Sequence, residues 1–388
     1  MSILVYGATG FTGTLVARAL RARGMDLVLS GRDAGRLDAL AENLAGHGAG
    51  GLEVRPAALH DDAALARAMS GVEMAVACAG PFTRLGEPVV AAAVQAGVPV
   101  LDVAGEQEYL RAIYERFESP ARKRGVLVLS GMGLEIALGD LGAHVAARAA
   151  AHTAIGAAPG PEDAPRVDEV CVAYALNRFP PTTGTRMAAI DALSQPGWVW
   201  IGDRWDPVPP LHERRVVNFG PGMGERATLS FPSGEVMTVP RHVHARRVQT
   251  FLSLLDTGPF GDVVTRVARL VSPFVPALVR TAVGAQLRAQ IGTGAPDERP
   301  SETDRKFATF AVACEARLRF EDARLVVSGH DPYGVTAEIA AWAVETLRAR
   351  MQRSLLPMGV RTPSEIFAPE ETLEALIVRC DLDAYRSF

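Results

Sequence analysis

Lysine is almost missing from this chain of 388 residues, which contains only Lys123 and Lys306. No tyrosine stands four residues before either lysine, so the Tyr-x-x-x-Lys pair of short-chain dehydrogenases is excluded. Lys123 lies in the sequence ARKRG, which is typical of an exposed helix end. A lysine-assisted oxidative deamination therefore has no obvious lysine to use.

Cysteine is scarce as well, and the four that occur are far apart with no C-x-x-C pair: Cys78, Cys171, Cys314 and Cys380. This spacing indicates neither a disulfide framework nor a zinc knuckle, so we expect no metal site and a reducing, cytoplasmic location. The formal net charge of −4 offers no basic surface to nucleic acid. Ile3 already begins a strand pattern without a basic segment before it, so no signal peptide is expected.

Long apolar runs are absent too. A helix that spans a membrane needs about 18 consecutive apolar residues, so no such helix is expected. The nearest candidate, Pro259–Gly292, is interrupted by five charged residues: Asp262, Arg266, Arg269, Arg280 and Arg288. We favour a helix packed on its own protein. A lid over a site and an amphipathic helix on a membrane surface stay open as alternatives.

Short apolar runs alternating with helical patterns dominate the first third of the chain. The expected strands are Ile3–Tyr6, Leu27–Ser30, a segment near Val54, Met74–Ala79, Val98–Asp102 and Val126–Ser130. Such alternation predicts a parallel sheet covered on both faces. The fold class we expect is α/β, with a doubly wound Rossmann sheet.

The sequence GATGFTG follows the first expected strand and opens a helical pattern. In a doubly wound fold, Gly7 would permit the tight turn and Gly10 the close approach of a phosphate, while Gly13 would let the helix pack on the strand. A structural glycine turn needs only one glycine, so we interpret the motif as a dinucleotide site.

The second expected strand ends in LVLSGRD, with no acidic residue at the strand end to bond the ribose hydroxyls of NAD. Arginine presents a planar, always charged fork that suits a phosphate dianion. We therefore predict NADP(H), with Ser30 and Arg32 on the 2′-phosphate. The alternative is that Arg32 caps a helix and Asp33 binds the ribose.

Two further loops lie where ligands of such folds bind, beyond the carboxyl ends of the strands. In CAGPFTRLGEP, Gly80 and Pro81 make a stiff turn and Phe82 could press on the nicotinamide or the ribose. In LDVAGEQEY, Asp102 and Glu106 are the candidate catalytic carboxylates, able to hold substrate or relay protons. Their competing structural roles are a helix cap and a first-turn acid.

From Val167 onward strand-like runs dominate, which predicts an inserted α+β domain on a mostly antiparallel sheet. FPSGEV is typical of a hairpin turn, and PRHVHARR places His242 and His244 on one face of an expected strand. We expect three segments: 1–140 as the NADP-binding domain, 141–330 as the substrate and dimerisation domain, and 331–388 as a helical return to the first domain.

The motifs quoted above, with SGMGLEIALGDLGAHV, TTGTRMAAIDAL and GVRTPSEIF, resemble the saccharopine dehydrogenase-like oxidoreductases and in particular the branch with bacterial trans-acting enoyl reductases. The resemblance implies a homodimer that binds NADP(H). It implies a cofactor site that includes Gly7, Thr9, Gly10, Phe11, Thr12, Gly13, Ser30, Arg32, Gly80, Pro81 and Phe82, with Asp61 available near the adenine. Met132 and Arg186 are the expected substrate contacts.

Together these features predict an NADPH-dependent reductase acting on an activated double bond, either an enoyl C=C or an imine C=N. The substrate would be a small molecule or a carrier-bound group, and the setting bacterial specialised metabolism. The alternative is a redox-sensing regulator that binds NADP(H) without turning it over. The sequence does not choose between the two double bonds.

Overall fold

The computed structural model describes residues 2–48, 50–155, 164–253, 261–281, 286 and 299–388. The chain divides into two compact units. Unit 1 comprises residues 1–134 and 333–362, and unit 2 comprises residues 135–332 and 363–388.

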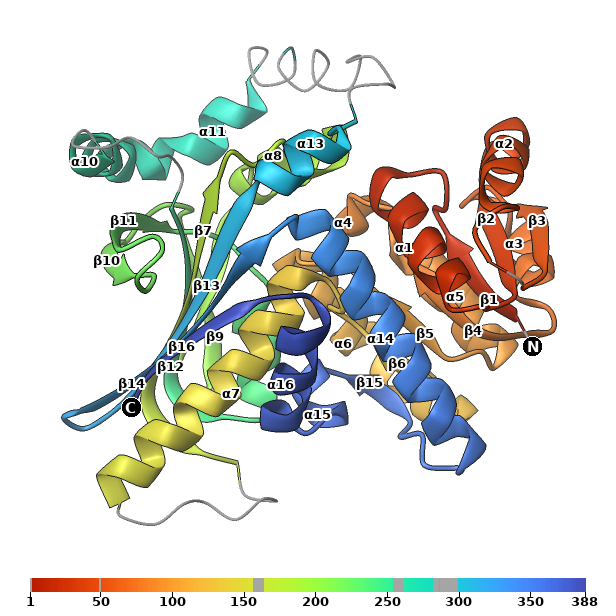
Figure 1. The fold of residues 1–388 in the computed structure, drawn as a ribbon. Helices are drawn as coiled ribbons and strands as arrows, with labels where there is room; N and C mark the ends of the chain where they lie inside the picture. The colour runs from red at the N-terminus through yellow and green to blue at the C-terminus, as the bar shows by residue number, and fades with distance from the viewer. Residues whose placement is uncertain (1, 49, 156–163, 254–260, 282–285, 287–298) are drawn as a thin grey trace. The chain divides into compact units, whose positions relative to one another are not determined.

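The described residues of unit 1 form a seven-stranded sheet in which every paired neighbour is parallel, with the order β15-β6-β5-β4-β1-β2-β3 (Figure 1). Consecutive residues of the central strand β1 are buried, so both faces of the sheet are covered. The order reverses direction between β1 and β4, which is where doubly wound folds bind ligands. The strands are β1 (Ser2–Tyr6), β2 (Leu27–Gly31), β3 (Leu52–Pro56), β4 (Val72–Ala77), β5 (Val100–Asp102), β6 (Leu127–Leu129) and β15 (Gly359–Arg361).

The helices of unit 1 begin and end where local chemistry predicts. Asp33 and Asp61 cap their helices by accepting from the backbone N–H groups three residues on. Gly97 and Gly125 end α5 and α6 in the left-handed conformation, which glycine adopts without strain. The helices are α1 (Phe11–Ala22), α2 (Ala34–Leu44), α3 (Asp62–Met69), α4 (Phe82–Leu85), α5 (Glu87–Ala96), α6 (Gln107–Arg124) and α14 (Pro332–Gln352).

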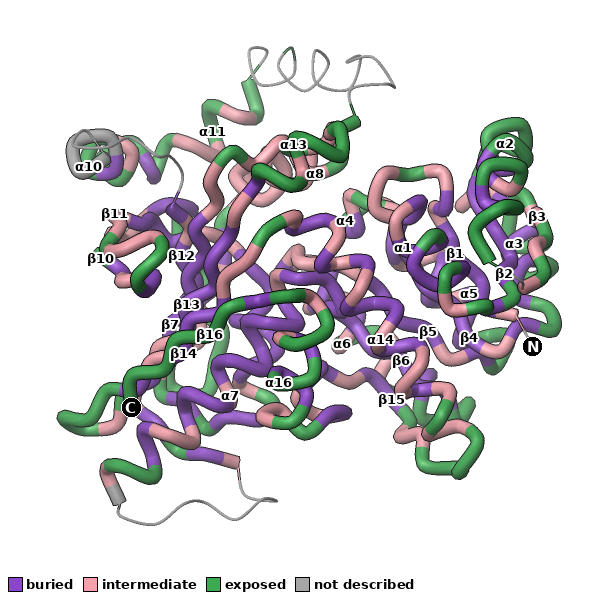
Figure 2. Tube along the Cα trace, viewed as in Figure 1, coloured by how far each residue is buried: buried purple, intermediate pink, exposed green. Residues whose placement is uncertain are grey.

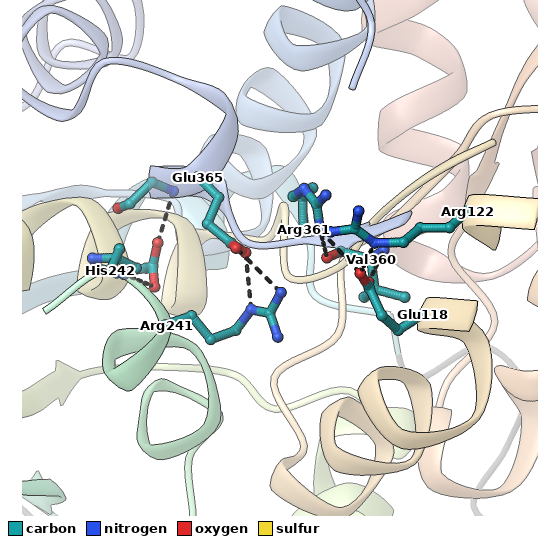
Figure 3. Close-up of polar contacts among 9 residues, drawn as sticks. Glu118, Arg122, Arg241, His242, Val360, Arg361 and Glu365 are labelled. Carbon is teal, nitrogen blue, oxygen red and sulfur yellow. Dashed lines mark hydrogen bonds and ion pairs between the residues drawn. The ribbon is translucent and has the colours of Figure 1, made fainter. Parts of the chain in front are cut away.

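Strand β15 is a seventh strand beyond the six that the sequence predicts. The Glu118 carboxylate on α6 holds it, because Glu118 accepts the Val360 N–H at 2.7 Å and lies 3.5 Å from the Arg361 guanidinium (Figure 3). Arg122, one turn further along α6, also donates to Glu118. The strand has only three residues, too few for a periodic signal in the sequence.

Unit 2 is built on a mixed sheet that holds nine strands among its described residues, with β12 parallel to β7 and the other pairs antiparallel. The main path runs β10-β11-β12-β7-β13-β14-β16, and β8 pairs with β12 and β9. The strands are β7 (Arg166–Asn177), β8 (Gly197–Ile201), β9 (Arg204–Val208), β10 (Arg214–Asn218), β11 (Glu225–Ser230), β12 (His244–Ser253), β13 (Thr309–Leu318), β14 (Glu321–His330) and β16 (Asp383–Ser387). The predicted fold class is confirmed.

Helix α7 packs on one face of this sheet through its glycines. A Cβ on Gly142 would lie 2.7 Å from the Cys314 sulfur, so only glycine allows this approach. The opposite face has its own core, where Phe219 and Phe251 cover small residues of β7 and β13. The helices of unit 2 are α7 (Leu134–Ile155), α8 (Thr183–Leu193), α9 (Glu235–Thr238), α10 (Gly261–Val271), α11 (Val275–Arg280), α13 (Glu302–Phe307), α15 (Pro363–Ile366) and α16 (Pro369–Arg379), with 3-10 turns at Val239–Arg241 and Ser272–Phe274.

One local expectation for unit 2 is corrected, because FPSGEV does not form a hairpin turn: Glu235–Thr238 is the helix α9. Of the C-terminal residues, 333–362 belong to unit 1 and 363–388 to unit 2. Within unit 2, Arg241 binds the Glu365 carboxylate through two nitrogens at 2.9 and 3.1 Å, which ties α15 to the segment before β12 (Figure 3).

Candidate cofactor site

The glycine loop between β1 and α1 is packed so closely that side chains would not fit at two of its glycines. Gly7 has φ +78°, and a Cβ there would lie 2.9 Å from the Ala79 nitrogen. A Cβ on Gly13 would lie 2.2 Å from the Gly7 carbonyl oxygen. A Cβ on Gly10 would meet only that oxygen, at 3.1 Å, so Gly10 faces otherwise open space.

The first turn of α1 presents backbone donors to this open side. Gly10 is the N-cap residue, and no side chain caps the helix. The first N–H groups of a helix have no partner within it, and the helix dipole favours an anion there. The Thr14 hydroxyl stabilises the loop by hydrogen bonding to the carbonyl oxygens of Ala8 and Gly10, at 3.0 and 2.8 Å. This arrangement fits the pyrophosphate of a dinucleotide.

The end of β2 supplies the positive charge beside the loop. Arg32 is exposed. Burial raises the pKa of Tyr6 to about 12, and the positive charge of Arg32 opposes this rise, so Arg32 lies near Tyr6 at the end of β1. Arg36 reaches back to the Thr9 carbonyl at 3.3 Å. The sequence reasoning missed Arg36, which lies in the first turn of α2, four residues after Arg32 in GRDAGR.

Two other predicted contacts near this end are engaged elsewhere. The Ser30 hydroxyl is buried and donates its hydrogen to the Arg55 carbonyl at 2.8 Å, so it has no hydrogen left for a phosphate. Asp33 accepts the Arg36 N–H at 3.0 Å as the cap of α2, which competes with a ribose contact. Asp61 likewise caps α3, where it accepts from Ala64 at 2.9 Å.

The loop after β4 carries a cis bond between Gly80 and Pro81. The Phe82 ring points into the interior, where it packs on Tyr109 with 5.3 Å between ring centroids. Phe82 is therefore not placed to press its ring on a nicotinamide, and this loop can contact a cofactor through its backbone. The Phe82 N–H donates to the Glu106 carboxylate at 3.0 Å, which fixes the loop to the start of α6.

Asp102 is fully enclosed at the end of β5. Its carboxylate accepts four hydrogen bonds, from the Tyr109 and Ser130 hydroxyls at 2.9 and 2.7 Å and from the Ala104 and Gly131 N–H groups at 3.1 and 2.9 Å. Burial raises its pKa, and these donors oppose the shift. With all four donors in place, the geometry favours a structural anchor over a proton relay.

The expected substrate contacts lie in different units. Met132 is completely buried in unit 1, where its N–H donates to the Asp102 carbonyl at 2.7 Å. Arg186 lies on α8 of unit 2, in the first turn that Thr182 caps. Unit 1 contains the other parts of the candidate site: the glycine loop, Arg32, Arg36, Glu106 and the loop at Gly80.

Comparison with known proteins agrees with this geometry. Residues 3–129 match the family model described as the saccharopine dehydrogenase NADP binding domain. Residues 3–129 are therefore similar to the NADP-binding domain of saccharopine dehydrogenases. The family resemblance predicted from the sequence is thereby confirmed.

Curated relatives of this chain include a trans-acting enoyl reductase of Mycobacterium ulcerans, 31% identical over 156 residues, which are 40% of this chain and 37% of the relative. A saccharopine dehydrogenase-like oxidoreductase of Mus musculus is 26% identical over 159 residues, 36% of each chain. The chain thus matches little more than a third of each of these relatives. The apo saccharopine dehydrogenase (L-Glu forming) of Saccharomyces cerevisiae covers the whole of both chains with a TM-score of 0.63 at 12% identity, which shows the shared fold.

A second group of titratable residues lies buried in unit 2. Glu235 contacts the Tyr174 hydroxyl, which also lies 3.1 Å from the Glu135 carbonyl. One phenol hydrogen cannot serve both acceptors, so a proton on Glu235 completes the pair of bonds. Burial raises the pKa of Glu235 well above its usual range, and the nearby Glu135 carboxylate raises it further.

Glu235→Gln is expected to flatten the pH dependence of stability. The pKa of Glu235 is higher in the folded state than in the unfolded state, where it is about 4.3. The contribution of Glu235 to the wild-type free energy of unfolding is therefore complete below about pH 4.3 and is lost as the pH rises through the folded pKa. The loss is about 1.4 kcal/mol for each unit by which the folded pKa is raised. Glutamine stays neutral, so the variant gains stability over the wild type with rising pH. Urea unfolding between pH 4 and 8 measures this, with the exposed Glu321→Gln as the control; parallel curves for Glu235→Gln and wild type would contradict it.

The histidines of PRHVHARR do not share a strand face as expected. His242 precedes β12 and is buried, with its Nε2 2.7 Å from Asp140 and its Nδ1 3.1 Å from Nδ1 of His144. His244 begins β12 and is exposed. Burial and the charge of His242 lower the pKa of His144 to about 3.

Among the described residues, no three His, Cys, Asp or Glu side chains converge as metal ligands would. None of the helices described here is long and apolar enough to span a membrane.

Proposed function

We propose that the chain is an NADPH-dependent oxidoreductase that reduces an activated double bond, an enoyl C=C or an imine C=N, of a small-molecule or carrier-bound substrate. The packing of the glycine loop is the observation that supports it most. Gly7 and Gly13 have no room for a Cβ, whereas Gly10 leaves the approach to the first turn of α1 open. Close approach of a phosphate is the physical reason for such a site.

Different residues of unit 1 would bind different parts of the cofactor. The backbone N–H groups of Phe11, Thr12 and Gly13 would bind the pyrophosphate, and Arg32 with Arg36 the 2′-phosphate. Bound NADPH supplies a hydride. Glu106 holds the loop at Gly80 and Phe82, which would fix the position of the nicotinamide relative to the substrate.

The substrate class rests on the relatives. The mycobacterial relative is named a trans-acting enoyl reductase, and it favours the C=C bond. In that case hydride adds to the β carbon and a proton to the α carbon. For an imine, hydride adds to carbon and a proton to nitrogen. A homodimer and a cytoplasmic location remain part of the proposal, and light scattering on the purified protein checks the first.

Binding and turnover test the function in sequence. Fluorescence titration should show binding of NADPH and much weaker binding of NADH. Oxidation of NADPH, followed by its absorbance, should then accelerate with either a short enoyl thioester or a cyclic imine. Tight NADPH binding without oxidation by any member of a broad panel of either class would favour the redox-sensing regulator.

Glu106→Gln is expected to lower turnover by about 100-fold while leaving NADPH affinity unchanged, if this carboxyl also transfers the proton. Glutamine keeps an oxygen that can accept the Phe82 N–H, so the loop stays in place. Steady-state rates and NADPH titrations measure the two effects. The matched control is Glu115→Gln on the exposed side of α6. Unchanged turnover in Glu106→Gln would limit Glu106 to positioning the loop.

A further inference from the structure

The described stretch 265–281, which spans most of α10 and all of α11, exposes its largest apolar side chains. Leu270 is 78% exposed, Phe274 70% and Leu278 63%, and Val267 and Val271 are about half exposed at 54% and 48%. Residues 267, 270 and 271 follow the spacing of one face of α10, and Phe274 ends the 3-10 turn that comes next. Soluble proteins rarely leave such a contiguous apolar surface open unless it binds something.

In this stretch polar residues are buried and large apolar residues are exposed, the opposite of what the hydrophobic effect favours. The buried residues include Thr265 and Ser272, 6% and 3% exposed, while Leu270 and Phe274 are exposed. Most of the described trace of α10 and α11 is coloured as exposed or intermediate (Figure 2). Polar contacts hold the stretch on unit 2. Arg214 donates to the Thr265 hydroxyl at 3.0 Å, and Arg280 donates to the Ser194 carbonyl at 2.9 Å. The apolar face is thus held outward by the fold itself.

The charge of the stretch is of one sign. Residues 265–281 contain Arg266, Arg269 and Arg280 and no aspartate or glutamate, in a chain whose formal net charge is −4. A surface that combines outward apolar side chains with arginines alone complements an anionic, partly apolar partner. The headgroup layer of a bilayer with acidic phospholipids has both properties.

We propose that residues 265–281 form a docking surface for an anionic phospholipid bilayer, on which this stretch lies parallel to the membrane plane. Leu270, Phe274 and Leu278 insert at the boundary between headgroups and acyl chains, and the exposed Arg266 and Arg269 contact the phosphates, while Arg280 stays on the Ser194 carbonyl. A second copy of the chain is a poorer occupant. A symmetric interface would bring two identical sets of three arginines together with no acid between them.

Vesicle flotation tests this surface on the whole chain. The wild type should float with vesicles of phosphatidylcholine mixed with phosphatidylserine, and about tenfold less with phosphatidylcholine alone, because the arginines contribute only with the acidic lipid. Binding should weaken with added salt, which screens the arginines. The double variant Leu270→Glu/Phe274→Glu should lose flotation while keeping the wild-type unfolding temperature and NADPH affinity.

The matched control is Val378→Glu on α16, which changes a side chain that is 84% exposed outside the stretch. It should float like the wild type. The proposal is overturned if the wild type does not bind acidic vesicles or if the double variant floats equally well. It is also overturned if light scattering shows a wild-type dimer that the double variant dissociates, because the face would then belong to a second copy. NADPH binding is read separately, so failure here leaves the proposed function standing.

Discussion

Gly10→Val is expected to weaken NADPH binding by at least about 100-fold, or about 2.7 kcal/mol, while the chain still folds. Gly10 has φ −69° and ψ 166°, a conformation open to valine, and its Cβ would meet only the Gly7 oxygen at 3.1 Å. The rest of the side chain would stand over the first turn of α1, where the pyrophosphate would lie. Fluorescence titration measures the affinity, and thermal unfolding should stay cooperative.

Gly13→Ala separates the cofactor effect from a folding effect. A Cβ at Gly13 would lie 2.2 Å from the Gly7 oxygen, so α1 must move away from β1, at a cost of about 1–3 kcal/mol. This variant should lower the unfolding temperature as well as binding. Gly46→Val is the control, because nothing lies within 4 Å of a Cβ there. Wild-type NADPH affinity in Gly10→Val would remove the main support for the proposed site.

The double variant Arg32→Ala/Arg36→Ala is expected to remove the preference for NADPH over NADH. Each charge-assisted contact to a phosphate is worth about 1.5–3 kcal/mol, so NADPH affinity should fall by more than about 100-fold when both are lost. NADH has no 2′-phosphate, and its affinity should change by less than about threefold.

Two single changes sharpen this test. Arg36→Ala alone should show a partial loss, because the Arg36 side chain lies at the Thr9 carbonyl beside Arg32. Ser30→Ala should leave the NADPH to NADH ratio unchanged, since its hydrogen is used on the Arg55 carbonyl. Equal losses for both cofactors in the double variant would mean that the arginines do not distinguish the 2′-phosphate.

Local patterns predicted the framework of this site correctly. The apolar run of β1 and the spacing of the three glycines are patterns within about a dozen residues, so the sequence alone displays them. The caps at Asp33 and Asp61 are equally local, but there the residue type alone could not distinguish a cap from a ligand. Arg36 was missed because its contact joins α2 to the glycine loop, where Thr9 lies 27 residues earlier in the chain.

The sequence by itself determined the two sheet classes, the glycine loop and the family resemblance, because these depend on periodicity and on residues close together in the chain. Only the tertiary structure decided which polar side chains remain available for chemistry. Ser30, Phe82 and Asp102 look functional in the sequence, yet each is engaged with a residue 7–28 positions away. The outward apolar face of 265–281 likewise depends on which side of the helix the rest of unit 2 covers. Burial and pairing are set by distant contacts, and no local pattern contains them.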